Sequence, residues 1–321
     1  MGMHRSGTSA LAGLFGGRGV CAGDRFIQAS QDNADGYWEH EELVTLNDLL
    51  LSAAGTDWRT IDAVSGDDIR RAGASLTDRA AAFLTDLARA RPLWFMKDPR
   101  LCRTLPFWQP HLDALPVHIC YLHVIRDPWS VARSLASRDG MSAAHSHLLW
   151  ALHNLEAEAQ TRGRPRVWLH FDAMITGGDP VVLAAIRQHL PEGIVPAVEG
   201  TEGPTIRPDL VRAAGATDDA TGAPFDIGRL YTLLGALSQN DGQASLLADL
   251  DAMRAQITTQ ILTYRSLLLN DERDELRARA TAMAIQAQER LDLWRQTDEQ
   301  LRIVTEQRDR VLRLLQERKG Q

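Results

Sequence analysis

Residues 2–9 read Gly-Met-His-Arg-Ser-Gly-Thr-Ser and run directly into the apolar segment Ala10–Phe15. Glycines at positions 2 and 7 allow tight backbone turns, so that successive N–H groups can converge on an anion. Thr8 and Ser9 add hydroxyl groups where the apolar segment predicts a helix, and a helix N-terminus also favours an anion. The stretch therefore predicts an anion-binding loop. For a glycine-rich loop taken alone, an ordinary strand-to-helix turn is the alternative.

The spacing of this loop copies the Walker A pattern G-x-x-x-x-G-K-[ST] of nucleotide-binding proteins, with one substitution. Thr8 stands where that pattern has its lysine, and the cation lies earlier in the loop, at Arg5. Without the lysine, the loop is poorly suited to hydrolysing a nucleoside triphosphate. The residues expected to hold the anion are His4, Arg5, Ser6, Gly7, Thr8 and Ser9.

A second candidate anion site follows the apolar segment Ile119–Ile125, which predicts a buried strand. Pro128 suits the first turn of a helix. It therefore places Arg126 at the end of the strand and Ser134 about two turns into the helix. An arginine fork and a hydroxyl group together make a good receptor for a phosphate. A surface pair of Arg126 and Asp127 is the alternative.

The pattern of apolar runs predicts a layered α/β fold. Buried strands are expected at Leu93–Met96, Ile119–Ile125 and Val167–Phe171. Helices are expected at Asp78–Arg89, Trp129–Ala136 and Ala143–Thr161. Together with the Walker-like loop, this order predicts a three-layer, P-loop-like domain with a central parallel sheet, which binds ligands at the carboxyl ends of its strands. Residues 213–223 are rich in small and polar residues and predict a surface loop.

The composition changes at residue 270, after which Arg, Glu, Gln, Asp and Leu dominate and proline is absent. A heptad pattern fits this tail, and nine of its twelve a and d positions are apolar. The expected organisation is a catalytic domain at 1–269 and a coiled-coil helix at 270–321. The coiled coil would join two copies of the chain or dock a partner enzyme. One long amphipathic helix folded back on the first domain is the alternative.

Composition and charge exclude several classes of protein. The chain has 321 residues and a net charge of −7, which argues against a surface that coats nucleic acid. No apolar run is long enough to span a membrane, and residues 1–5 do not read as a secretory signal. The three cysteines, Cys21, Cys102 and Cys120, form no CxxC pair, so a disulfide scaffold is not expected. The expected compartment is the reducing cytoplasm.

Together the two anion motifs resemble those of the PAPS-dependent sulfotransferases, whose donor is 3′-phosphoadenosine 5′-phosphosulfate (PAPS). Residues 2–9 look like that family's 5′-phosphosulfate loop, with Arg5 where cytosolic members have lysine. Residues 124–135 look like its 3′-phosphate motif, with Arg126 and Ser134 at the two matching positions. Further stretches similar to bacterial members are Gly-Tyr-Trp-Glu at 36–39, Lys-Asp-Pro-Arg-Leu at 97–101 and Phe-Asp at 171–172. The resemblance covers residues 1–270.

The resemblance implies transfer of a sulfuryl group from PAPS to a hydroxyl, without a metal ion and with PAP as the second product. Arg5 would stabilise the leaving nucleotide, and a carboxylate would accept the proton of the hydroxyl. Asp24 matches the position of a catalytic glutamate in relatives and ranks ahead of Glu39, with Glu42 and Asp98 behind them. The acceptor is expected to be a carbohydrate or glycoconjugate, by analogy with bacterial members.

Two other interpretations and one departure stay open. The chain could be a degenerate P-loop kinase or nucleotide hydrolase, or a coiled-coil scaffold with a vestigial nucleotide site. His145, His147 and His153 lack the i, i+4 spacing of a helical zinc site, so no metal is expected there. The family has a buried strand directly before the loop, whereas only Met1–Met3 precedes it here. A natural start further upstream is therefore expected, and a sheet that tolerates so short a first strand is the alternative.

Overall fold

The computed structural model describes residues 1–20, 22–27, 36–61, 64–187, 189 and 225–262, together with the single tail positions 281, 283, 286, 288 and 308. The chain divides into two compact units, Met1–Leu262 and Thr263–Gln321. The boundary expected at 269/270 and the loop expected at 213–223 lie outside the described residues. The coiled coil expected at 270–321 lies outside them too, apart from the single tail positions, which are helical.

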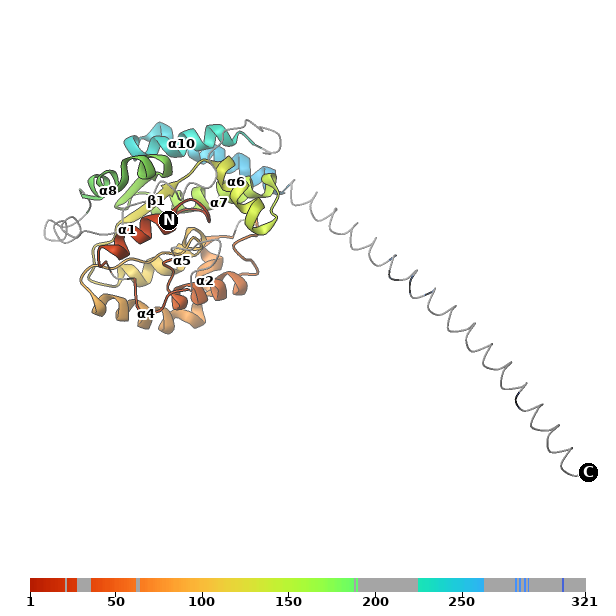
Figure 1. Cartoon of the computed structure of the whole chain (residues 1–321), viewed down its shortest axis with the longest axis horizontal. Helices are drawn as coiled ribbons and strands as arrows, with labels where there is room; N and C mark the ends of the chain where they lie inside the picture. Colours follow the sequence, from red (N-terminus) through yellow and green to blue (C-terminus); the bar gives the residue numbers. More distant parts are fainter. Residues whose placement is uncertain are drawn as a thin grey trace, which may run out of the picture. The chain divides into compact units, whose positions relative to one another are not determined.

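Helices make up most of the first unit (Figure 1). In chain order the elements are α1 (Thr8–Gly17), α2 (Glu41–Ala53), α3 (Gly66–Ala72), the 3₁₀ helix η1 (Ala74–Leu76), α4 (Thr77–Ala90), α5 (Leu101–Asp113), β1 (Tyr121–Ile125), α6 (Pro128–Asp139), α7 (Ala143–Thr161), β2 (Arg166–His170), α8 (Phe171–Arg187) and α10 (Ile227–Asn240). Residues 244–262 are also helical. The helices predicted at 78–89, 129–136 and 143–161 are confirmed as α4, α6 and α7.

Strands β1 and β2 form a parallel pair, with Tyr121 opposite Arg166 and Ile125 opposite His170. They confirm two of the three predicted strands: β1 lies within Ile119–Ile125, and β2 overlaps Val167–Phe171, whose last residue instead begins α8. Within the described ranges this two-stranded sheet is the whole of the strand structure. The α/β character is therefore present, but with a smaller sheet than the sequence predicted.

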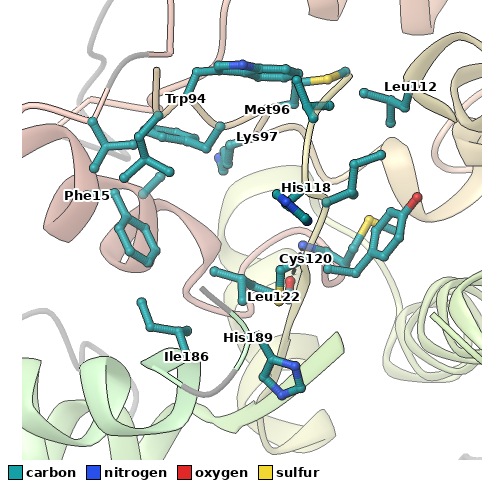
Figure 2. A pocket seen from close by; sticks show the side chains of 18 of the residues that line it. Phe15, Trp94, Met96, Lys97, Leu112, His118, Cys120, Leu122, Ile186 and His189 are labelled. Carbon is teal, nitrogen blue, oxygen red and sulfur yellow. Dashed lines mark hydrogen bonds between the residues drawn. The ribbon is translucent and has the colours of Figure 1, made fainter. Parts of the chain in front are cut away.

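The prediction of a strand at Leu93–Met96 is wrong. Within this segment Trp94 forms a single β-bridge, and the other three residues belong to no strand. The segment instead lines a cavity of about 390 Å³, together with residues 116–122 and the apolar face of α1 (Figure 2). A strand needs a neighbour for its backbone hydrogen bonds, and beyond the single bridge at Trp94 this segment belongs to no ladder among the described residues. The apolar side chains that suggested a strand are the lining of this cavity.

The first three residues run beside the edge of β1 that faces away from β2. The Met1 ammonium donates to the Leu122 carbonyl oxygen at 2.6 Å, and the Val124 N–H donates to the Met1 carbonyl oxygen at 3.0 Å. These are the bonds of a parallel pair, although the segment is too short to count as a strand. Burial lowers the pKa of the Met1 ammonium, because a charge is costly among apolar groups.

An engineered extension that continues this pairing should stabilise the domain. Four residues such as Val-Ile-Val-Ile before Met1 would turn the buried ammonium into an amide and fill the cavity that Met1 lines. Each buried apolar side chain contributes about 1.5–3 kcal/mol, so we expect thermal unfolding to shift upward by about 5 °C or more. A Gly-Ser-Gly-Ser extension is the control. Equal melting temperatures for the two extended proteins would contradict the expectation.

Two apolar clusters hold the elements that carry the candidate site. One packs α2, α4 and α5 around the fully buried Trp108 and Leu50. The other packs α1 against β1, β2 and α8 through Leu14, Val124 and Met174. The N-terminus of α1 is therefore fixed beside the carboxyl ends of both strands, where parallel sheets bind ligands.

Candidate functional site

The loop before α1 has the backbone that its glycines were expected to supply. Gly2 and Gly7 have φ angles of 141° and 91°, in the left-handed region that favours glycine. A Cβ at Gly7 would lie 2.2 Å from the ring of Phe171, so only glycine fits there. The Ser6 N–H donates to the Met3 carbonyl oxygen at 3.1 Å and closes the turn. The first N–H groups of α1, from Thr8 on, have no acceptor within the helix and can bind an anion.

The two predicted anion motifs meet at this loop. The Arg5 Nε donates to the Ser134 Oγ at 2.8 Å, across 129 residues of sequence. The Arg126 Nη1 donates to the Arg5 carbonyl oxygen at 2.9 Å. Arg126 follows the end of β1 and Ser134 lies in α6, so a strand end, a helix and the loop each supply one group. Arg5, Arg126 and Ser134 therefore form one cluster.

The cluster has a strongly positive character. Arg126 is buried, and its guanidinium carbon lies 4.2 Å from the centroid of the Phe171 ring. Burial and the nearby charge of Arg5 lower the pKa of Arg126, while Asp172 and Asp127 oppose this. An arginine stays protonated even so. Two guanidinium groups at a helix N-terminus repel each other, and a bound anion would relieve that repulsion.

A buried lysine links the loop to a carboxylate. The Lys97 Nζ donates to the Ser9 Oγ at 3.0 Å, to the Tyr37 carbonyl oxygen at 2.9 Å and to the Glu39 Oε1 at 2.5 Å. Three acceptors match the three N–H bonds of an ammonium group. Lys97 was not among the predicted site residues, although a cation directly after an apolar run was a signal for it. The structure thus brings Glu39 within one side chain of the anion loop.

The environment of Glu39 makes its carboxylate basic. Its side chain is 10% exposed, and burial raises its pKa, although the Lys97 ammonium opposes the shift. Asp98, which is also buried, contributes to the increase. The Arg100 Nη1 lies 3.9 Å from the Glu39 Oε2 and donates to the Asp98 Oδ1 at 3.0 Å. The positive charges of Lys97 and Arg100 therefore oppose, without reversing, the effect of burial on the pKa of Glu39.

The other predicted carboxylates lie in different surroundings. The Asp24 side chain is 92% exposed, and its Oδ1 lies 3.8 Å from the His40 Nε2. Glu42 pairs with Arg79 through two hydrogen bonds. Asp98 accepts a hydrogen bond from the Asn47 Nδ2 at 2.8 Å and is held inside the domain. By its link to the loop, Glu39 is the best placed of the four.

His4 and Ser6 of the loop are both buried. The His4 ring lies 4.2 Å from the Trp58 ring, and burial holds the pKa of His4 well below its usual value. His4 is therefore neutral and adds no positive charge. Within the described residues the His4 Nε2 and the Ser6 Oγ have no hydrogen-bond partner. Buried polar atoms normally have one, so these two atoms are unsatisfied within the described part of the chain.

The described residues contain no group of three His, Cys, Asp or Glu side chains that could hold a metal ion. No helix among them is long and apolar enough to cross a membrane.

Comparisons with family models, with curated proteins and with solved structures found no match for the chain.

Proposed function

We propose that the protein is a sulfotransferase that moves the sulfuryl group of PAPS to a hydroxyl of a carbohydrate or glycoconjugate. The observation that carries the proposal is the contact of Arg5 with Ser134 at 2.8 Å, beside Arg126. It brings a 5′-phosphosulfate-like loop and a 3′-phosphate-like motif together. A donor with phosphate on both sides of one ribose requires two adjacent anion receptors of this kind.

Each group then has a role in holding the donor. The N–H groups at the start of α1, with Arg5, would hold the 5′-phosphosulfate. Arg126 and Ser134 would hold the 3′-phosphate. In the transfer, the bond between sulfur and the bridging oxygen of the donor breaks and a bond from sulfur to the acceptor oxygen forms. The negative charge that develops on the departing PAP lies next to Arg5, which is where preorganised positive charge lowers the barrier.

The acceptor hydroxyl must lose a proton, and we assign Glu39 as the base that takes it. A general base works best when its pKa lies near the working pH. Burial moves the pKa of Glu39 in that direction. The fully solvated Asp24, which the sequence ranked first, lacks this environment. The bond from Lys97 to both Ser9 and Glu39 supports a base next to the donor loop.

We also propose that the protein acts in the reducing cytoplasm. We propose that its tail joins two copies of the chain or docks a partner enzyme. Among the described residues Cys102 and Cys120 are free thiols, which fits that compartment. A degenerate kinase or hydrolase is less favoured, because Thr8 replaces the Walker lysine. A scaffold with a vestigial site is less favoured because Arg5, Arg126 and Ser134 are all present and in contact.

PAP should raise the melting temperature without magnesium, because a ligand that binds only the folded state stabilises it. Arg126→Ala should weaken PAP binding by about 1.5–3 kcal/mol, the scale of a charged hydrogen bond. Titrations in a thermal-shift assay measure both effects. Arg164→Ala is the matched control, since that arginine pairs with Asp113 on the surface.

The same assay separates the three candidate functions. Stabilisation by ATP–Mg or GTP–Mg in preference to PAP would favour the kinase or hydrolase. A folded protein whose melting curve is unmoved by millimolar PAP would remove the donor assignment. Equal losses of PAP affinity in Arg126→Ala and Arg164→Ala would show that PAP responds to the net charge of the protein and not to Arg126 in particular.

A further inference from the structure

The segment 36–39 contacts α1 through the Trp38 indole and through a hydrogen bond from the Ser9 Oγ to the Tyr37 carbonyl oxygen at 3.5 Å. We propose that Trp38 is a positioning residue: its indole rests on Gly13 and Gly16 of α1 and thereby fixes the Tyr37 carbonyl and the Glu39 carboxylate at Lys97. The inference rests on the proposed function for the role of Glu39. It assigns to Trp38 no contact with either substrate.

The surface of α1 is shaped to receive the indole. A Cβ on Gly16 would lie 2.1 Å from the Trp38 Cζ3, and a Cβ on Gly13 would lie 3.2 Å from the Trp38 Nε1. Glycine in a helix interior lowers its stability relative to alanine. Two glycines three residues apart on one helix face are therefore explained by packing against another segment rather than by the stability of the helix. Here they open the space that the indole occupies.

The backbone of Trp38 is strained. Its φ angle is 56°, in the left-handed region that is unfavourable for a bulky residue. Such strain persists only where the surroundings fix the residue, and it concentrates at functional sites. The contacts of the indole are the two glycines on one side and the Phe26 ring, at a centroid distance of 5.8 Å. The backbone after Trp38 is also held, because the Ile27 N–H donates to the Glu39 carbonyl oxygen at 2.9 Å. Release of the indole would let this backbone relax.

The residues on either side of Trp38 are the ones that Lys97 binds. The Lys97 Nζ donates to the Tyr37 carbonyl oxygen at 2.9 Å and to the Glu39 Oε1 at 2.5 Å. A relaxed Trp38 would move both acceptors relative to Lys97 and to Ser9, which Lys97 also binds. A displaced base loses rate steeply, whereas the donor contacts of Arg5, Arg126 and Ser134 come from other elements.

A double-mutant cycle between Gly16 and Trp38 tests the contact itself. Gly16→Ala should lower the melting temperature in the wild-type background, because the new methyl group meets the indole. In the Trp38→Ala background the same change should leave the melting temperature unchanged or raise it, since alanine favours the helix. Equal effects of Gly16→Ala in both backgrounds would overturn the proposed anchoring.

Turnover tests the positioning role. Gly16→Ala and Trp38→Ala should each lower kcat by about 10–100-fold, with the PAP dissociation constant within about twofold of wild type. Trp38→Phe keeps a flat ring over the glycines and should recover most of the lost kcat. Unchanged kcat in both alanine variants would overturn the role of Trp38.

The two proposals fail in distinguishable ways. Coupled melting effects in a protein that PAP does not stabilise would support the anchoring of Trp38 and overturn the sulfotransferase assignment. Coupled melting effects, PAP binding and a selective loss of kcat would support both. Loss of PAP affinity in parallel with kcat would overturn the positioning role, because it would show a general disturbance of the loop.

Discussion

Glu39→Gln should lower turnover by about 10²–10⁴-fold while it leaves PAP affinity nearly unchanged. Glutamine keeps the size of the side chain and an oxygen that can accept from the Lys97 Nζ, which lies 2.5 Å from the Glu39 Oε1. It lacks the negative charge that accepts the proton of the acceptor hydroxyl. Steady-state kinetics with PAPS and an acceptor, beside PAP titrations, separate the two effects.

Asp24→Asn is the matched control for the base. Its side chain is 92% exposed, so the change should leave both kcat and the fold intact. The reverse result, an inactive Asp24→Asn protein and an active Glu39→Gln protein, would move the base to Asp24, as the sequence ranked it.

The pH dependence gives a second measurement on Glu39. Burial raises the pKa of this carboxyl above its ordinary value, and the ionised form is the base. Turnover should therefore fall as the pH drops through that raised pKa. Lys97→Met removes the main opposing charge, so it should move the acid limb of the profile to higher pH. An acid limb at the ordinary glutamate pKa would contradict the assignment.

Local patterns in the sequence were sufficient to predict the loop before α1 and the helix after β1. Gly7 has the positive φ angle that a tight loop requires, and Pro128 is the first residue of α6. Both features depend on a few neighbouring residues. The contact between Arg5 and Ser134 depends on how distant elements pack, so the sequence could suggest it only through a resemblance to a family with both motifs.

The sequence did not predict which side chains are buried or which backbone segments pair as strands. The apolar run Leu93–Met96 has the composition of a buried strand, but it lines a cavity and, within the described ranges, forms only a single bridge at Trp94. Asp24 follows Gly23 and Glu39 follows Gly36-Tyr37-Trp38, and neither local pattern says which of the two carboxylates is buried. Lys97 directly follows the apolar run Leu93–Met96 in the sequence, but its bonds to Ser9 and Glu39 depend on how distant segments pack.

Arg5→Ala should cost far more in turnover than in PAP binding. The negative charge on the departing PAP develops during transfer, so a cation next to it contributes most in the transition state. Loss of one preorganised donor of this kind lowers kcat by about 10²–10³-fold. PAP affinity should fall by about tenfold or less, because Arg126 and the N–H groups of α1 still hold the nucleotide.

Arg5→Lys separates the charge of Arg5 from its geometry. Lysine keeps the positive charge but has no counterpart of the Nε that donates to the Ser134 Oγ at 2.8 Å. We therefore expect kcat between those of wild type and Arg5→Ala, with PAP affinity close to wild type. Single-turnover rates with PAPS and PAP dissociation constants, measured for all three proteins, show how much Arg5 contributes to catalysis and how much to binding. Equal losses in binding and in rate for Arg5→Ala would mean that Arg5 holds ground state and transition state alike, and its catalytic role would have to be abandoned.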